Sequence, residues 1–357
     1  MQENESTVLP EYLTGPAFLV ENQIVTQLNS AAEQRQIPLG ARIQELISTG
    51  SQEYASFHSG KLYLQLYVAG VQYNACVSCY KKAHLFCILS DYTSKELQVL
   101  SLTSSSLRAP LQSALDGIEA LTKRLSDSAD PIVRKNFGQI NHSLHQLLRS
   151  VGNLSDASFY SQHRLDEFEY LDAKSLFAEI AEKLQATIPT EMCTIHYSGF
   201  TKSVFTMLDP RAIERAIYNL VSNAAKFSPK NSIVTFKASS KGNRLYITLE
   251  NDCDTVYSPV TQLFDNYLRD PALEDSRLGI GLGLSVVRNI VSSHHGTLLV
   301  SQKTKKTISF TLSIPITEKS FQILKSPFGI KVDYSGGFDP ILVELSDVLP
   351  DEIYESI

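Results

Sequence analysis

The sequence predicts an α+β chain of several domains, and three patterns support this prediction. Aromatic and β-branched residues alternate over residues 61–91, which is typical of β-strands. Apolar residues recur at intervals of three and four over residues 97–154, which is typical of packed helices. From about residue 170 onward, strand and helix patterns follow one another, which predicts a mixed sheet with helices on one face. A length of 357 residues allows two or three domains, each with its own core.

The first domain is expected over residues 11–94 as an α/β unit. Residues 17–34 have the pattern of a strand, a turn at Glu21-Asn22, a second strand and a helix. Residues 61–91 add three strands, with Lys81 and Lys82 at the turn between the last two.

Four potential metal ligands lie close together in this domain, namely Cys76, Cys79, His84 and Cys87. Because side chains alternate between the faces of a strand, Cys76 and Cys79 point to opposite faces, which disfavours a shared metal ion. We therefore interpret them as buried structural thiols. The chain has five cysteines, an odd number, and no secretory signal, which argues against disulfides.

Residues 95–165 are expected to form an antiparallel hairpin of two helices. Pro131 is well placed to begin the second helix. A short polar connection between two helices makes them antiparallel neighbours. The apolar seams of the two helices consist of Leu97, Leu100, Ser104, Leu107, Leu111, Ala114, Ile118, Leu121 and Leu125, and of Phe137, Ile140, Leu144, Leu147, Val151 and Leu154.

The most informative motif is AIYNLVSNAAKFSP over residues 216–229. Asn219 and Asn223 share one face of a helix, and Lys226 follows on that face. An amide oxygen there can ligate Mg²⁺, and the lysine can meet a phosphate. Some fifty residues later, alternating glycines precede a second helix, where backbone N–H groups can approach phosphate oxygens. These glycines are Gly279, Gly281 and Gly283.

In this order and spacing, the two motifs resemble the N-box and the G2 box of the sensor histidine kinases, within the wider GHKL group of ATPases. The resemblance covers residues 11–316. It implies a PAS-like sensor domain over 11–94, a hairpin over 95–165 that dimerises into a four-helix bundle, and a GHKL (HATPase) α/β sandwich over 170–316. Phe264 resembles the short F-box.

The resemblance also implies ATP with Mg²⁺ as the cofactor, with Asn223 as the Mg²⁺ ligand. A homodimer through residues 95–165 and a response regulator or other signalling protein are the implied partners. The implied nucleotide-binding positions are Asn219, Asn223, Lys226, Phe227, Asn251, Gly279, Gly281 and Gly283.

The hairpin departs from the family at its phosphoacceptor box. The segment SSLRAPL over residues 105–111 aligns with the family pattern His-Glu-Leu-Arg-Thr-Pro-Leu. Ser105 therefore takes the place of the phosphorylated histidine, Ser106 that of the acid/base carboxylate, and Ala109 that of the residue used for phosphatase action. A serine hydroxyl is a poor nucleophile without an adjacent base. His142 and His145 of the second helix are interpreted as solvent-facing or seam-flanking residues.

The residues expected on the adenine side of the site also depart from the family pattern. Asn251 takes the place of the aspartate that binds the adenine amino group, and Cys253 and Thr255 replace the two glycines that follow it. Asparagine offers an acceptor without charge assistance. A Cβ at a glycine position blocks positive φ and close backbone approach.

Three functional classes follow from these features. The first is an active sensor histidine kinase that phosphorylates a response regulator. The second, which we favour, is a pseudokinase that regulates a partner through its dimer and a residual nucleotide site. The third is a GHKL ATPase or a serine protein kinase.

The net charge of −6 argues against nucleic acid as a partner. No apolar run reaches the roughly 18 residues that span a bilayer, and the N-terminus lacks signal-peptide features, so we expect a cytoplasmic protein without membrane contact.

Two further features lie near the end of the chain. His294 and His295 precede Gly296, and we expect them to act as cations at a helix C-terminus rather than as metal ligands. Residues 317–357 extend beyond the usual end of the family. Their apolar residues predict that they fold, either against the sheet or onto a partner.

Overall fold

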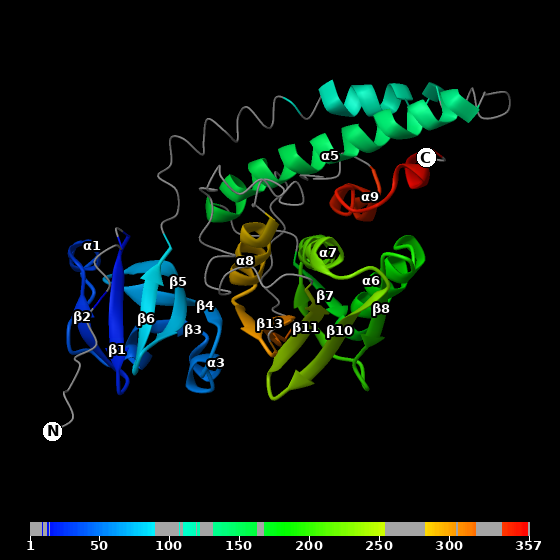
Figure 1. Cartoon of the computed structure of the whole chain (residues 1–357). Helices are drawn as coiled ribbons and strands as arrows, with labels where there is room; N and C mark the ends of the chain where they lie inside the picture. Colours follow the sequence, from blue (N-terminus) through cyan, green and yellow to red (C-terminus); the bar gives the residue numbers. More distant parts are fainter. Residues whose placement is uncertain are drawn as a thin grey trace.

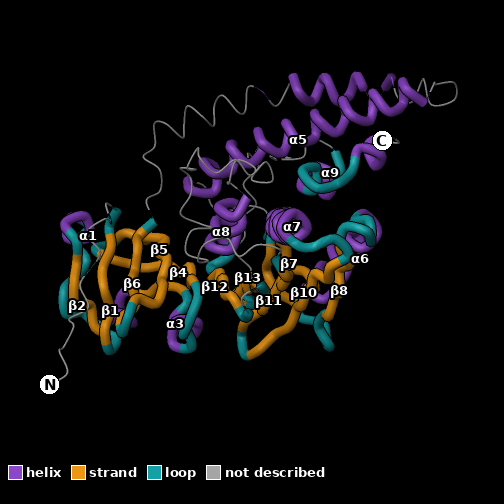
Figure 2. The backbone as a smooth tube through the Cα atoms, viewed as in Figure 1, coloured by secondary structure: helices purple, strands orange, loops and turns teal. Residues whose placement is uncertain are grey.

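The computed structural model describes residues 9, 13, 15–89, 107, 110–118, 120–121, 131–162, 168–253, 283–304, 306–318 and 338–355. Most of its strands lie in one eleven-stranded sheet of order β2-β1-β6-β5-β4-β12-β13-β11-β10-β8, with β3 paired to β4 (Figure 2). A mixed α/β architecture with a large sheet is therefore confirmed. Among the described residues, no helix combines the length and apolarity that a bilayer span requires.

The N-terminal part of the sheet follows the predicted alternation. Its strands are β1 (Ala17–Glu21), β2 (Ile24–Leu28), β3 (Ile47–Thr49), β4 (Lys61–Val68), β5 (Val71–Tyr80) and β6 (Ala83–Ile88). The first turn lies at Asn22 and Gln23, one residue later than predicted, and both have positive φ, as two-residue hairpin turns often require. Three short helices accompany these strands, α1 (Ser30–Gln34), α2 (Ile43–Leu46) and α3 (Ser51–Ala55).

The C-terminal part of the sheet has helices on one face (Figure 1). Its strands are β8 (Cys193–Ser198), β10 (Ser232–Lys241), β11 (Arg244–Asp252), β12 (Thr297–Gln302) and β13 (Thr307–Pro315). A small separate sheet joins β7 (Glu169–Asp172) to β9 (Phe205–Leu208). The helices are α6 (Ala173–Thr187), α7 (Pro210–Phe227) and α8 (Gly283–Ser293).

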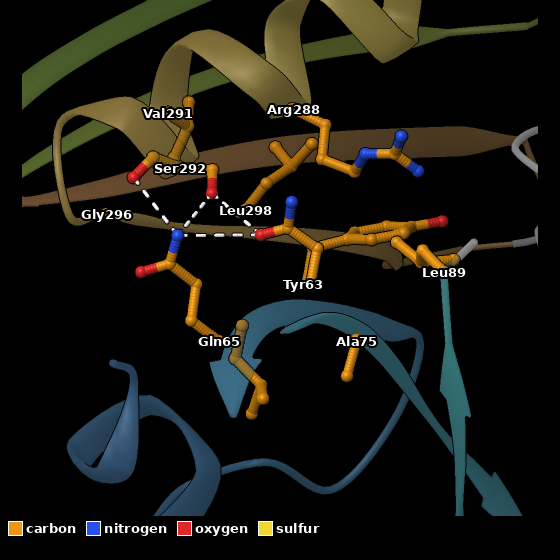
Figure 3. A pocket seen from close by; sticks show the side chains of 11 residues that line it. Tyr63, Gln65, Ala75, Leu89, Arg288, Val291, Ser292, Gly296 and Leu298 are labelled. Carbon is orange, nitrogen blue, oxygen red and sulfur yellow. Dashed lines mark hydrogen bonds between the residues drawn. The ribbon is translucent and has the colours of Figure 1, made fainter. Parts of the chain in front are cut away.

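The two parts are joined through β4 and β12, which pair antiparallel, with Leu62 opposite Leu299. Polar side chains reinforce this junction. Gln65 donates from Nε2 to Ser292 Oγ at 2.5 Å, at the end of α8 (Figure 3). Arg244 pairs with Glu53 at 2.6 Å. The sequence did not predict this continuity, because the backbone groups that join two strand edges leave no pattern in the side chains.

The long helix α5 (Pro131–Gln162) begins at Pro131, as predicted. A preceding helix over 110–118 contacts it through Leu115, which is buried against Leu148 and Val343. These contacts lie outside the predicted seams. Four seam residues stay about half exposed in the single chain, namely Leu107, Leu121, Ile140 and Leu147.

Residues 338–355 pack against helices α5 and α7. They comprise α9 (Pro340–Glu344) and the 3-10 helix η2 (Asp351–Glu355), and they lie beside α5 and α7 (Figure 1). The apolar residues of this region, Ile341, Leu345, Leu349 and Tyr354, belong to the core cluster that the sheet shares with its helices. Its acidic residues have partners on α5 and α7, described below.

The junction gives a first prediction. Gly60, which precedes β4, has a φ of +89°, and a Cβ there would lie 2.2 Å from the backbone oxygen of Val300 on β12. Gly60→Ala should therefore separate β4 from β12 and increase hydrogen exchange of the β12 amides. Gly70→Ala is the matched control, since Gly70 has a φ of +84° but no described atom within 4 Å of an added Cβ. Both variants incur the left-handed backbone cost of about 1–2 kcal/mol. Equal β12 exchange in the two variants would contradict a tight junction.

Candidate functional site

Helix α7 carries the asparagine motif and is held by strong local signals. Asp209 caps its N-terminus by accepting from the Ala212 N–H at 3.0 Å, and Pro210 occupies the first turn. The helix buries one apolar face in the core, which consists of Ala212, Ile213, Ala216, Ile217, Leu220, Val221 and Ala224. This packing fixes the direction in which the polar residues of α7 project.

Asn219 and Gly283 are brought together although 64 positions separate them. A Cβ built at Gly283 would lie 2.6 Å from Asn219 Oδ1, so the first residue of α8 contacts the asparagine side chain directly. Asn219 is fully buried, and its Oδ1 accepts no hydrogen bond from the residues that the structure describes. The first asparagine of one motif and the last glycine of the other thus line one site.

The amide group of Asn219 is engaged by the C-terminal segment. Its Nδ2 donates to Glu344 Oε2 at 2.7 Å and to the Arg215 carbonyl at 3.1 Å. Glu344 is itself fully buried, and its Oε1 pairs with Arg215 Nε at 2.9 Å. Burial of both charges requires such pairing, because an unpaired ion in the interior is costly.

Lys226 is also paired with this segment. Its Nζ contacts Asp347, whose carboxylate lies 2.6 Å from Arg149 Nη1 of α5. Burial raises the pKa of Asp347, but the charges of Arg149 and Lys226 outweigh burial and hold that pKa below its usual value. Asp347 is therefore a carboxylate at neutral pH.

Asn223 and Phe227 are half-buried on α7, one turn and two turns beyond Asn219. The spacing of four and three places Asn219, Asn223 and Lys226 along one side of the helix. The structure thus shows the shared face that the sequence predicts.

Asn251 lies at the end of β11 and is buried. Its Nδ2 donates to Ser228 Oγ at 3.0 Å, immediately after α7. Cys253 donates its N–H to the Lys306 carbonyl at 2.7 Å, which continues the pairing beyond β11. Asn251 and Cys253 therefore lie in extended backbone that continues the antiparallel pairing of β11 with β13.

The remaining motif residues lie outside the described residues. These are Ser105, Ser106, Ala109, Thr255, Phe264, Gly279 and Gly281.

His294 corrects an expectation from the sequence. It is buried, and burial lowers its pKa to about 4, so it is neutral at physiological pH and is not a cation at the helix end. Its Nε2 accepts from the Asp209 N–H at 3.1 Å, so its proton lies on Nδ1, 2.8 Å from the Ile290 carbonyl. His294 thus connects the end of α8 to the start of α7.

The histidines of α5 correct a second expectation. His145 is fully buried, and His142 lies against the C-terminal segment, where its ring stacks on Tyr354 with centroids 4.6 Å apart. Both nitrogens of His142 are engaged, Nδ1 with Asp351 and Nε2 with the Ser346 carbonyl, each at 2.5 Å. Neither histidine faces solvent, because the C-terminal segment covers both. The other expected position, beside the seam, holds for His145, which follows Leu144. The sequence did not show this burial, because the covering segment is about 200 residues away.

Comparison with known proteins identifies the family. Residues 208–318 match the family model "Histidine kinase-, DNA gyrase B-, and HSP90-like ATPase". Residues 208–318 thus belong to this ATPase family, and the relatives of the chain are sensor kinases.

Two histidine kinase family relatives show the extent of this similarity. The probable sensor kinase SilS of Salmonella typhimurium is 34% identical over 113 residues, which are 31% of this chain and 22% of the relative. The adaptive-response sensory kinase SasA of Synechocystis sp. is 26% identical over 233 residues, 61% of this chain and 59% of the relative. The chain thus spans less than two thirds of either relative. Full-length ShkA in complex with AMPPNP is 18% identical, with a TM-score of 0.49 over 62% of this chain and 46% of that chain.

The neutral, buried His294 generates a second prediction. The unfolded chain binds a proton at this residue below its ordinary pKa of 6.5, whereas the folded chain does so only below about 4. The stabilisation is therefore present above pH 6.5 and is lost as the pH falls to about 4, a difference of about 3 kcal/mol. His294→Gln retains an acceptor for Asp209 without a titrating ring, so its stability should fall less steeply across this window in urea unfolding.

His196→Gln on β8 is the matched control, because His196 is exposed and does not contribute to the lowered pKa of His294. The control should retain the pH dependence of the natural sequence. Parallel curves for all three proteins would show that His294 does not titrate in this range.

Proposed function

We propose that this chain is a signal-transduction protein of the histidine kinase family that binds Mg²⁺ and a nucleotide but does not phosphorylate histidine. The observation that carries the nucleotide assignment is the contact between Asn219 and Gly283, with Asn223 and Lys226 on the same side of α7. Asn223 is the proposed Mg²⁺ ligand, and Lys226 with the glycine segment is the proposed phosphate-binding group.

Loss of kinase activity is proposed from the phosphoacceptor position. Ser105 stands there, and Ser106 cannot act as its base. Neither α5 histidine is a substitute, since His145 is buried and both nitrogens of His142 are engaged. An active sensor kinase remains the second candidate, because the relatives are named as sensor kinases.

The residues on the adenine side support weak selectivity between adenine and guanine nucleotides. Asn251 has its amide group engaged by Ser228, and Cys253 continues the β-ladder at the place of a family glycine. A neutral acceptor contributes roughly 1 kcal/mol less than a charged one. We propose that the nucleotide is held mainly by its phosphates and Mg²⁺, so that ATP and GTP bind with similar affinity.

The domain arrangement is part of this proposal. Residues 11–94 act as a PAS-like sensor domain, residues 95–165 as the dimerisation hairpin, and residues 170–316 as the GHKL domain. Residues 317–357 form a C-terminal extension. The output partner is a response regulator or another signalling protein in the cytoplasm.

A third prediction tests the nucleotide site by calorimetry. The natural protein should bind ATP and GTP weakly and only with Mg²⁺, and Asn223→Ala should weaken binding at least tenfold because it removes an oxygen ligand of the metal. Asn243→Ala, in the exposed turn between β10 and β11, is the matched control and should bind as the natural protein does. Binding that does not depend on Mg²⁺, or equal loss in both variants, would contradict the assignment.

Incubation with labelled ATP separates the pseudokinase from the active kinase. No acid-labile phosphate should accumulate, since Ser105 has no neighbouring base. Stoichiometric phosphohistidine would establish the sensor kinase in its place.

A fourth prediction concerns the homodimer. The half-exposed seam residues form an apolar stripe that a second copy can bury in a four-helix bundle. Leu147→Asp should convert the dimer to a monomer in light scattering, because the carboxylate would be desolvated without a partner. Leu39→Asp is the control, since Leu39 is 64% exposed but lies outside the hairpin. A monomer already in the natural sequence at micromolar concentration would refute the dimer.

A further inference from the structure

The C-terminal segment, residues 338–355, is docked on the proposed nucleotide site by an apolar anchor. Ile341, Leu345 and Tyr354 are buried in the main core cluster, which α7 also lines. The Tyr354 carbonyl accepts from Asn141 Nδ2 of α5 at 3.2 Å. Figure 1 shows α9 and the end of the chain beside both α5 and α7.

Two acidic residues of this segment bind the polar groups of the asparagine motif. Glu344 accepts from Asn219, and Asp347 pairs with Lys226. A carboxylate is an oxyanion, as a phosphate is, and it offers the same type of acceptor to an amide or an ammonium group. Asp347 therefore occupies the ammonium group to which the proposed function assigns phosphate binding, and Glu344 occupies the amide of Asn219, which lines the same site.

The two carboxylates differ in what holds them. Glu344 is fully buried and neutralises Arg215, whose side chain is 1% exposed, so its removal would take a carboxylate away from a buried cation. Asp347 is 27% exposed and lies at the edge of the site. Asp347 also pairs with the buried Arg149, but Arg149 lies 3.5 Å from Glu344 as well and keeps that carboxylate when Asp347 leaves Lys226.

We infer that the C-terminal segment is an inhibitory element of the nucleotide site, in which Glu344 anchors the segment and Asp347 competes with nucleotide phosphate for Lys226. This inference rests on the proposed function. A phosphate chain beside Asp347 would place like charges at close range, so binding requires Asp347 to move away from Lys226. The competition is reciprocal, since nucleotide that displaces Asp347 also weakens the docking of the segment.

Displacement of Asp347 by nucleotide would also change contacts made by α5 of the hairpin. Asp347 pairs with Arg149 of α5, and Asp351 contacts His142 two turns earlier on that helix. Arg215 of α7 donates to Asn153 of α5 at 3.2 Å. Release of the segment would thus loosen contacts between α5 and α7, and nucleotide occupancy would change how the hairpin is held.

Asp347→Asn in the full chain tests the inference. The amide retains the shape but removes the competing charge, so the dissociation constant for Mg²⁺–ATP should fall at least fivefold in calorimetry. Asp347→Ala, a second variant, should shift the constant in the same direction. Glu352→Gln is the matched control, because it removes one negative charge from an exposed position of the same segment and should leave the constant unchanged.

Hydrogen exchange gives a second readout on the natural protein. Saturating Mg²⁺–ATP should increase exchange of the amides in residues 338–355, while exchange in β10 and β11 stays constant. Unchanged or weaker affinity in both Asp347 variants overturns the inhibitory contact and leaves nucleotide binding intact. Absence of nucleotide binding in the natural protein and in every variant overturns both proposals.

Discussion

The buried ion pair between Arg215 and Glu344 joins three segments that are distant in sequence. Arg215 belongs to the middle of α7, Glu344 ends α9, and Asn153 of α5 accepts from the same guanidinium. Both charged side chains are at most 1% exposed, so their charges must be compensated within the protein, and Arg149 Nε adds a second cation 3.5 Å from Glu344 Oε2. Removal of one partner from such a pair costs about 3–5 kcal/mol, because the remaining charge stays buried. The mutual position of α5, α7 and the C-terminal segment depends on this pair.

The position of Asn219 follows from that pair. It lies one turn after Arg215 on α7, so the carboxylate that neutralises the guanidinium also reaches the asparagine amide. On its other side, Asn219 contacts the first residue of α8, while the last turn of α8 contacts Gln65 of β4 through Ser292. One helix therefore has its start at the candidate site and its end at the junction of the two sheet parts. Movement of α8 at either end must be accommodated at the other.

Local patterns predicted much of this fold, and contacts between distant residues account for the errors. The strands β4, β5 and β6, the turn at Lys81 and the start of α5 at Pro131 all depend on neighbours within a few positions. The pairing of β4 with β12 was not predictable, because the backbone hydrogen-bonding groups at a strand edge are the same in every strand and do not specify a partner. The prediction that His294 is charged was wrong, because the burial of His294 depends on α7 and Phe168. The sequence near position 294 does not reveal these contacts.

The docking of the C-terminal segment did leave a signal in the sequence. Glu344 interrupts the apolar run Ile341–Leu345, and Arg215 interrupts the apolar positions of α7. A charge in an apolar run predicts a buried partner of opposite sign, although the sequence does not show which one.

The candidate site divides into two sides with different physical properties. On the proposed phosphate side, Asn219 and Lys226 contact carboxylates of the C-terminal segment, and Gly283 contacts Asn219. On the adenine side, the amide of Asn251 is bonded to Ser228, and Cys253 extends a ladder, so less of the backbone is available to a base. On the proposed function, the phosphates and Mg²⁺ supply most of the binding energy through their charge. The C-terminal carboxylates act on that same electrostatic contribution, so we expect a change at Asp347 to alter occupancy more than a change on the adenine side.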